Sequence, residues 1–384
     1  MQYPAPMLKI HWFLPTGGDS RDVVPSDDGA PPRHPSIDYL TQVASACDIL
    51  GFDALLTPCG TGCEDAWIST AMLIDRTRRV KFLVAFRPGL LSPTLAAQMA
   101  STYQRLSGGR LALNIVVGAE PAELARFGDF HDKASRYERA GEFIDVMRGA
   151  WADEPFDYDG DHYRVEGADT RAVPRPTPDI YFGGASGNAE HVAARTADVY
   201  LTWGEPPDMV AERVGRMRDL AAAEGRELRL GIRFHTIARP TSAEAWAVAD
   251  ALLDGISPEA ISAARADFAG TQSEGQRRMA ALHEQAGSGG STGREGLEIY
   301  PNLWAGIGLV RGGAGTALVG SFDEVADLIG TYADLGFEEF ILSGYPHLEE
   351  AWWVGEGVLP ILRDRGLVAP LDDAAGPAQV FHFR

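Results

Sequence analysis

The sequence has few cysteines and no long apolar run. Its 384 residues contain only Cys47, Cys59 and Cys63, too few for a disulfide framework. Cys59 and Cys63 lack the second ligand pair that a structural zinc site requires, so we expect no metal. No run of about 18 apolar residues predicts a membrane span, and the N-terminus lacks signal-peptide features. We therefore expect a soluble, cytoplasmic protein.

Basic residues are also in short supply. The chain has 34 basic against 54 acidic residues, which gives a formal net charge of −20. A field of this sign disfavours binding to nucleic acid or to an anionic membrane. An anionic small molecule would need a local basic pocket. The hydrophobic residues, 45% of the chain, suffice for a large core.

Short apolar runs recur along the chain and predict eight strands. Most are separated by amphipathic segments whose apolar residues recur at intervals of three and four. The runs lie at 9–14, 54–58, 81–86, 111–117, 179–184, 199–204, 229–238 and 338–344. Alternation of this kind predicts an α/β fold, a (β/α)₈ TIM barrel. A doubly wound sheet is the weaker alternative, because no G-x-G-x-x-G follows the first run.

About 100 residues separate the seventh and eighth predicted strands, more than one helix needs. We expect a single domain over residues 1–384 with an insertion at about 240–320. Its Gly/Ser-rich stretch 287–296 indicates flexibility. It ends in 301–320, where Arg311 stands among six glycines. This segment is either a mobile lid that closes over an anionic substrate or an ordinary surface loop.

The seventh predicted strand carries the strongest site signal. Leu230, Ile232 and Phe234 share one face, while Arg233 and His235 share the face expected to point into the barrel. An unpaired arginine in a barrel interior is costly, so something must compensate its charge. An interior carboxylate and a bound anion are the two alternatives.

Two other positions carry weaker signals. Cys63 precedes Glu64 and Asp65, whose charges oppose a thiolate, so a packed thiol is favoured over a nucleophile. Ser186, in a GGASG turn before a predicted helix, is suited to receive a phosphate. The motifs G-x-S-x-G and H-E-x-x-H and the phosphate loop are absent.

Several ordered segments together resemble one family, the FMN-dependent alkanesulfonate monooxygenases of the bacterial-luciferase-like superfamily. The resemblance covers about nine tenths of the chain. The segments are HWFLPTGGD (11–19), CEDAW (63–67), RPGLLSPT (87–94), GGRLALNIVVG (108–118), SRYE (135–138), YFGGAS (181–186), LTWGEPP (201–207), GIRFH (231–235), QRRMAALH (276–283), PNLWAGIGLVRGGAGTALVG (301–320) and SGYPHLEEA (343–351).

The resemblance implies a two-component enzyme of sulfur metabolism. Reduced FMN would come from a separate NAD(P)H:FMN reductase, O₂ would be the cosubstrate, and an alkanesulfonate would yield an aldehyde and sulfite. It also implies a homo-oligomer, a tetramer in this family. A planar, permanently charged guanidinium suits a sulfonate, and a closing loop suits a flavin intermediate that water would destroy.

The resemblance also implies site residues. It places six residues on the substrate side of the flavin, namely Cys63, Arg233, His235, Arg311, Tyr345 and His347. The arginines would bind the anion, His235 would transfer a proton or donate a hydrogen bond, and Tyr345 would donate from its phenol. It places six more near FMN, with Tyr137 and Ser186 at the phosphate: Asn114, Glu123, Arg136, Tyr137, Ser186 and Trp203.

Two departures from the family pattern bear on the substrate. Gly17 replaces a histidine of the family's PTHGDG, and Thr61 and Gly62 replace an Arg-Ser pair. Both changes remove donors, and we expect them to create room for a bulkier sulfonate or a related organosulfur compound. Two other functions remain open. One is a flavin- or F420-dependent oxidoreductase with another substrate, and the other is a non-catalytic flavin-binding barrel.

Overall fold

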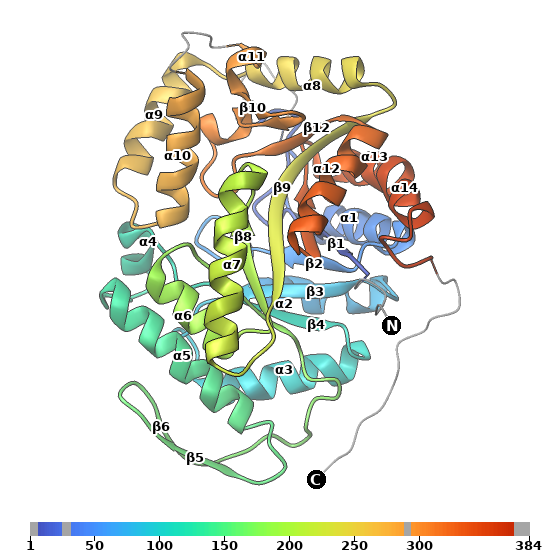
Figure 1. The fold of residues 1–384 in the computed structure, drawn as a ribbon. Coiled ribbons are helices and arrows are strands. Elements are labelled where there is room, and N and C mark those ends of the chain that lie inside the picture. Colours follow the sequence, from blue (N-terminus) through green and yellow to red (C-terminus); the bar gives the residue numbers. More distant parts are fainter. Residues whose placement is uncertain (1–6, 25–31, 288–292, 372–384) are drawn as a thin grey trace.

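The computed structural model describes residues 7–24, 32–287 and 293–371. Eight parallel strands, each hydrogen-bonded to the next, close into a barrel (Figure 1). In order around the barrel they are β1 (Lys9–Phe13), β2 (Ala54–Thr57), β3 (Lys81–Phe86), β4 (Leu111–Ile115), β7 (Ile180–Gly183), β8 (Val199–Trp203), β9 (Arg229–Arg239) and β13 (Glu339–Ser343). The predicted (β/α)₈ barrel is therefore confirmed, with all eight strands where the apolar runs lie.

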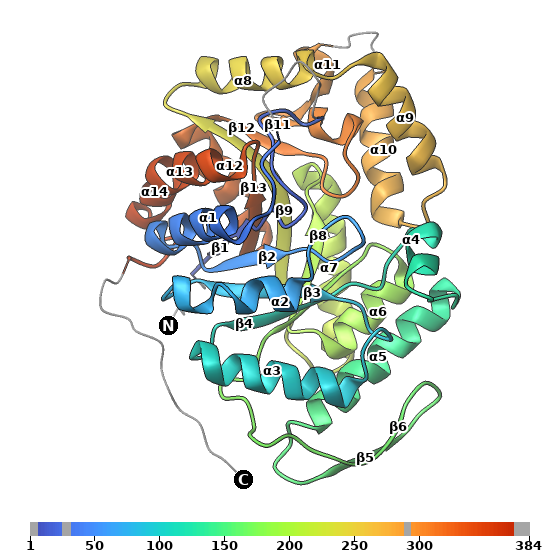
Figure 2. The same cartoon turned by 180° about the vertical axis from the view of Figure 1, so that it is seen from behind.

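Helices surround the barrel, as the two opposite views show (Figures 1 and 2). Those that connect successive strands or follow the last one are α1 (Ile37–Leu50), α2 (Ala66–Ala71), α3 (Pro93–Ser107), α4 (Pro121–Arg126), α5 (Lys133–Gly149), α6 (Gly187–Thr196), α7 (Pro207–Ala223), α12 (Phe322–Leu335), α13 (His347–Trp353) and α14 (Leu359–Asp364). A 3₁₀ turn (Ile74–Arg76) follows α2, and a π-helical turn (Val354–Val358) joins α13 to α14.

Local signals explain where the helices begin and end. Ser92 caps α3 by accepting a hydrogen bond from Leu95 N, and Pro93 opens the helix. The helix ends at Gly108, whose φ of 69° suits glycine. Ser321 and Glu324 form a capping box at the start of α12.

The barrel separates two apolar layers. The larger lies between the strands and the helices, and it includes Leu230, Ile232 and Phe234 of β9. The smaller fills the barrel interior with side chains such as Phe13, Leu56 and Ile341. Alternation along β9 therefore sends its apolar face outward, as the sequence predicts.

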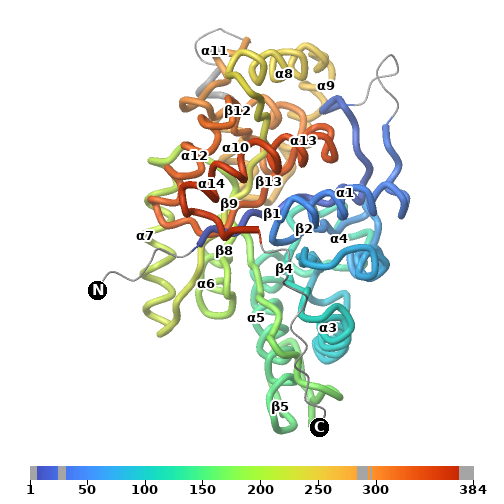
Figure 3. Tube along the Cα trace, turned by 90° about the vertical axis from the view of Figure 1, so that its right-hand side faces the viewer, coloured from blue at the N-terminus to red at the C-terminus, as the bar shows by residue number. Residues whose placement is uncertain are grey.

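The insertion between β9 and β13 is a substantial structure. It comprises α8 (Ser242–Asp254), α9 (Pro258–Ala269), α10 (Glu274–Gly287), α11 (Arg294–Leu297), β10 (Glu298–Tyr300), β11 (Leu303–Trp304), a 3₁₀ turn (Gly306–Leu309) and β12 (Ala317–Ser321). Its helices lie at the opposite end of the molecule from a hairpin of β5 (Phe156–Asp159) and β6 (Arg164–Ala168), as the side view shows (Figure 3).

The segment 301–320 is only partly a loop, because it contains β11, a 3₁₀ turn and β12, and its movement as a lid stays a prediction. Strand β12 pairs in parallel with the second half of β9, from Ala317 opposite His235 to Ser321 opposite Arg239. The glycines serve close packing, since a Cβ at Gly306 would lie 2.0 Å from the Trp304 ring. Residues 310–316, which include Arg311, form its longest irregular stretch.

Two further expectations concern the Gly/Ser-rich stretch and membrane-spanning helices. Most of the Gly/Ser-rich stretch, at 288–292, lies outside the described residues. Within the described ranges, no helix combines the length and the apolarity that crossing a membrane requires.

Candidate active site

Two cavities lie at the carboxyl ends of the barrel strands. The first, of about 660 Å³, is lined by residues that include Asn114, Trp203 and Arg233. The second, of about 600 Å³, is lined by residues that include Arg311 and His347. Cys59 and Glu123 line both cavities. The volumes suit a cofactor and a small substrate side by side.

Arg233 has no carboxylate partner among the residues that the structure describes. Its Cζ lies 4.6 Å from the ring centre of Phe13, inside the barrel, and its Nε and Nη2 have no hydrogen-bond acceptor. Burial, and then the nearby Arg311, lower the pKa of Arg233. Of the two alternatives for this arginine, the interior carboxylate is absent from the described residues, and the bound anion stays a prediction.

Arg311 reaches the same place from the insertion. Its Cζ lies 5.8 Å from the ring centre of Phe13 and 6.0 Å from that of Tyr345. Its Nη1 lies 3.2 Å from Nε2 of His235. No ion pair to Arg311 occurs within the described ranges, so Arg233, at the first cavity, and Arg311, at the second, both lie beside Phe13 without a counter-ion. Such a pair is a natural receptor for an anion.

His235 has a close neighbour at each ring nitrogen. Nδ1 lies 3.0 Å from Ser343 Oγ, and Nε2 lies 3.1 Å from Ala314 O. Its ring stacks on Tyr345 with centroids 5.5 Å apart. Burial, and then the cations Arg311 and Arg233, lower the pKa of His235 well below its usual range. His235 is therefore neutral and poorly suited to accept a proton.

His347 begins α13 and is held by Asp19, from the loop after β1. His347 Nδ1 lies 2.8 Å from Asp19 Oδ1, and its backbone N donates to Asp19 Oδ2 at 2.8 Å. Tyr39 also donates to this carboxylate. Burial lowers the pKa of His347 although Asp19 opposes the shift. Burial also raises the pKa of the Tyr345 phenol.

The loop after β2 contributes thiols and a close glycine contact. Cys63 Sγ lies 3.6 Å from Pro58 O and 3.5 Å from Gly60 O, and burial raises its pKa, so it is a protonated, hydrogen-bonding thiol. Gly17 faces this loop, and a Cβ there would lie 2.9 Å from Gly62 O. The expected extra room is therefore absent directly above Gly17, because the Gly62 peptide occupies it.

The residues beside α6 fit the phosphate of FMN. Ser186 precedes the helix without capping it, and its Oγ is buried without a partner among the described residues. A Cβ at Gly184 would lie 3.3 Å from the Tyr137 hydroxyl, which places that phenol beside the same turn. Free backbone N–H groups, a hydroxyl and a phenol form a donor set for a phosphate.

The other residues implied for FMN fall in two groups. Asn114, Trp203 and Glu123 line the first cavity, with Glu123 also paired to Arg87. Arg136 is placed differently, because its Nη1 donates to His131 O and its Nη2 donates to Gln272 Oε1 at 3.1 Å. Its guanidinium thus ties α5 to the insertion, and Arg136 is not among the cavity-lining residues.

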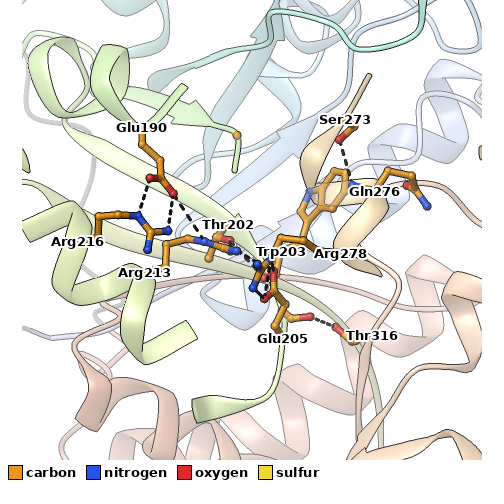
Figure 4. Close-up of polar contacts among 12 residues, drawn as sticks. Glu190, Thr202, Trp203, Glu205, Arg213, Arg216, Ser273, Gln276, Arg278 and Thr316 are labelled. Atoms are coloured by element: carbon orange, nitrogen blue, oxygen red, sulfur yellow. Dashed lines mark hydrogen bonds and ion pairs between the residues drawn. The ribbon is translucent and has the colours of Figure 1, made fainter. Parts of the chain in front are cut away.

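Alternating charges connect the insertion to the barrel (Figure 4). Arg213 Nη2 lies 3.0 Å from Glu205, which also accepts from Arg278 Nε of α10 at 2.9 Å. On the far side of Arg213, Arg216 Nε donates to Glu190 at 2.8 Å. The chain of ion pairs runs Arg216, Glu190, Arg213, Glu205, Arg278.

Helix α10 also holds the loop that carries Arg311. Gln276 Oε1 accepts a hydrogen bond from Gly313 N at 2.8 Å, two residues after Arg311. Gly275 lies against Trp203, where a Cβ would be 2.9 Å from the indole. Helix α10 therefore fixes the distance between the Arg311 loop and the barrel.

Sequence reasoning missed Asp19 and Gln276 as site residues. Asp19 follows the first strand in PTGGDS, so its position after a barrel strand was a usable signal. Gln276 opens the family-like segment 276–283, but its contact with Gly313, 37 residues further on, gave no local signal. No fixed spacing in the sequence predicts which distant backbone N–H a glutamine side chain will accept from.

Comparison with known proteins agrees with this architecture. A family model described as luciferase-like monooxygenase matches residues 8–339. Among similar solved structures, DmoA from Hyphomicrobium sulfonivorans has a TM-score of 0.79 at 20% identity, covering 97% of this chain and 91% of that one.

Two other solved structures are also similar. A riboflavin lyase with modified FMN and riboflavin has a TM-score of 0.77 at 23% identity, covering 96% of this chain and 94% of that one. EDTA monooxygenase from Chelativorans sp. BNC1 has a TM-score of 0.75 at 19% identity, covering 97% of each chain. At these identities the likeness establishes the fold, and the family model goes further because it matches most of the chain. The chain belongs to the luciferase-like monooxygenase family.

Proposed function

We propose that this protein is an FMNH₂-dependent monooxygenase that oxygenates a sulfonate with O₂ to give an aldehyde and sulfite. The observation that carries the proposal is that Arg233 and Arg311 both lie beside Phe13 without a carboxylate partner among the described residues. A sulfonate stays charged at any working pH, and its oxygens match the planar guanidinium fork.

Reduced FMN is the proposed cofactor, and a separate NAD(P)H:FMN reductase is the proposed partner. Ser186 and Tyr137 would hold the phosphate, and Asn114 and Trp203 would contact the remainder of the cofactor in the first cavity. When bound, the reduced flavin would supply the electrons that activate O₂. The similarity in fold to a solved structure that contains modified FMN supports this assignment.

The overall reaction balances with one proton released: R–CH₂–SO₃⁻ + O₂ + FMNH₂ → R–CHO + SO₃²⁻ + FMN + H₂O + H⁺. Arg233 and Arg311 would bind the sulfonate, and they would stabilise the second negative charge that develops as sulfite leaves. The Arg311 loop, held by Gln276, would limit the access of water to the site. Movement of this loop as a lid is part of the proposal.

An oxygenation assay tests the function. The protein is supplied with FMN, NAD(P)H, a flavin reductase and O₂, together with alkanesulfonates of increasing chain length and one arenemethanesulfonate. Carboxylates of the same chain lengths are the controls. We expect sulfite and aldehyde in equal amounts from at least one sulfonate. The proposal is wrong if no sulfonate yields sulfite while the reductase turns over.

Oligomeric state remains a prediction from the family resemblance. We propose a homo-oligomer, a tetramer in its specific form. Light scattering of the purified protein at two concentrations would report its mass, and a monomeric mass at both would contradict this part of the proposal.

A further inference from the structure

The two buried histidines of the site differ in their surroundings. Nε2 of His235 lies 3.2 Å from Arg311, and Nδ1 lies beside Ser343. Ala314 O, 3.1 Å from Nε2, can accept a proton carried there, but a second proton on this ring would create a cation beside the Arg311 guanidinium. His347 has the opposite arrangement, because its nearest charged neighbour is the carboxylate of Asp19, 2.8 Å from Nδ1.

Asp19 is held rigidly for this contact. Its side chain is fully buried, and its backbone N and O both pair with Arg33, at 2.9 and 2.7 Å. Its carboxylate accepts from the ring and the backbone N of His347, from Tyr39 and from Ser20 N. Burial opposes ionisation, but these donors outweigh it and lower the pKa of Asp19, so it is ionised at neutral pH.

An ionised Asp19 fixes the protonation of the His347 ring. A carboxylate can only accept, so His347 must carry its proton on Nδ1, and Nε2 is left with a lone pair. Within the described part of the chain, that buried Nε2 has no hydrogen-bond partner. His347 lines the second cavity beside Tyr345, with ring centroids 5.6 Å apart.

Other charged and titratable groups act on His347 as well. Burial, Arg311 and Arg233 lower its pKa, and Asp19 raises it. Tyr345 faces the ring, and burial raises the pKa of Tyr345, so it stays neutral. Phe13 packs on the ring from β1 with centroids 5.4 Å apart. Asp19 is thus the group that can balance an imidazolium at this position.

We propose that Asp19 is a positioning residue that holds His347 as a proton acceptor for the release of sulfite. This rests on the proposed function. The step concerns a 1-hydroxyalkanesulfonate, R–CH(OH)–SO₃⁻. Nε2 of His347 takes the hydroxyl proton, the O–H electrons form the C=O bond, and the C–S pair leaves on SO₃²⁻. His347 becomes an imidazolium paired with Asp19, and it later loses the proton to water.

The tautomer of His347 can be measured without flavin or turnover. Protein labelled with ¹⁵N in its histidine rings is studied by ¹⁵N–¹H correlation spectroscopy, and the His347 signals are assigned with His347→Gln. We expect a protonated Nδ1 and an unprotonated Nε2 at neutral pH. A protonated Nε2 in the wild-type protein would overturn the proposal.

Two variants separate positioning from simple structural support. Asp19→Asn removes the charge while keeping the size, and Glu349→Gln removes a carboxylate two residues from His347 that pairs with Arg33. We expect Asp19→Asn to populate the Nε2–H tautomer and Glu349→Gln to leave the tautomer unchanged. Unchanged tautomers in both variants, or equal changes in both, would overturn the positioning role.

Activity adds a pH readout. A base must be neutral, so turnover should fall as pH drops through the pKa of His347. Asp19→Asn removes the group that raises this pKa, so the acid limb should move to lower pH, with kcat reduced about 100-fold or more by loss of the correct tautomer. An unmoved limb would contradict the proposal. If the tautomers behave as expected and no sulfonate gives sulfite, the proposed function fails while the Asp19–His347 pair stands.

Discussion

Arg311 Nη1 lies 3.2 Å from His235 Nε2, so a cation from the insertion is in direct contact with a buried histidine of the barrel. Burial and this cation keep His235 neutral. The contact joins two segments that are 76 residues apart in the chain. The contact also gives the two residues different roles. Arg311 carries the positive charge, and the neutral His235 ring helps to position the Arg311 guanidinium.

The depressed pKa of His235 predicts a loss of stability in acid. In the unfolded chain the His235 ring binds a proton near pH 6.5, whereas in the folded protein it stays neutral. The free energy of unfolding should therefore fall as pH drops below that value. One such group contributes up to about 1.4 kcal/mol per pH unit. Urea unfolding at about pH 7 and about pH 5.5 should show a smaller loss for His235→Gln than for the wild type. Equal losses would contradict the assignment.

Removing the guanidinium of Arg311 should abolish turnover. Arg311→Ala removes the charge, and Arg311→Lys replaces a planar fork by a point charge that cannot bind two oxygens in parallel. We expect kcat/KM for sulfite release to fall about 100-fold or more in both, with unchanged circular dichroism. Arg265→Ala, exposed on α9 of the same insertion, is the matched control. Near-normal activity of Arg311→Lys would refute the bidentate contact.

The uncompensated charge of Arg233 predicts that an anion stabilises the protein. Wild-type protein should gain about 1.4 kcal/mol at a sulfonate concentration near ten times its Kd, seen as a rise in Tm. Arg233→Met should lose this response. Without ligand it should be more stable by about 1 kcal/mol, since cavity water hydrates part of the charge and limits the gain. A full sulfonate response in Arg233→Met would show that the anion binds elsewhere.

The Ser186 hydroxyl should strengthen binding of the FMN phosphate and leave binding of the flavin ring system unchanged. Ser186→Ala removes a hydrogen bond to a charged group, worth about 1.5–3 kcal/mol, so FMN affinity should drop roughly 10- to 100-fold. Riboflavin, which lacks the phosphate, should bind both proteins equally. Fluorescence titration measures both ligands, with Ser262→Ala on α9 as the control. Equal weakening for both ligands would place the phosphate away from Ser186.

Gln276 should influence substrate binding through the Arg311 loop. Gln276→Ala removes the acceptor for Gly313 N, a hydrogen bond worth about 1 kcal/mol. We expect KM for the sulfonate to rise about fivefold with a smaller change in kcat, and more hydrogen peroxide per sulfite because water enters the site. Steady-state kinetics with peroxide detection checks this, with exposed Glu259→Ala as the control. A change in kcat alone would argue against a loop-holding role.

The barrel was predictable because its signal is local and repeated. Each barrel strand is a short apolar run, and several helices have caps such as Ser92 and Gly108. Strand β12 was missed because its residues lie in a glycine-rich segment that suggests a loop, whereas β9 is long enough to pair with it. The hairpin of β5 and β6 is mostly exposed and has no apolar run to reveal it.

The site was predictable where a strand fixes the direction of a side chain. Alternation along β9 placed Arg233 and His235 in the barrel, and the family resemblance supplied Arg311 and Tyr345. The contact between Asp19 and His347 spans 328 residues, and no periodicity reports a pairing of that kind. Arg136 was expected at the flavin, but Gln272 of the insertion accepts from its guanidinium. Such contacts depend on how loops meet in the closed barrel.

A single-turnover experiment tests the central claim most directly. Protein with reduced FMN and a sulfonate is prepared without oxygen and then mixed with oxygenated buffer, and sulfite and hydrogen peroxide are counted per flavin. We predict close to one sulfite per flavin with the sulfonate present and hydrogen peroxide alone without it. Hydrogen peroxide in both cases, with no sulfite from any sulfonate, would contradict the claim.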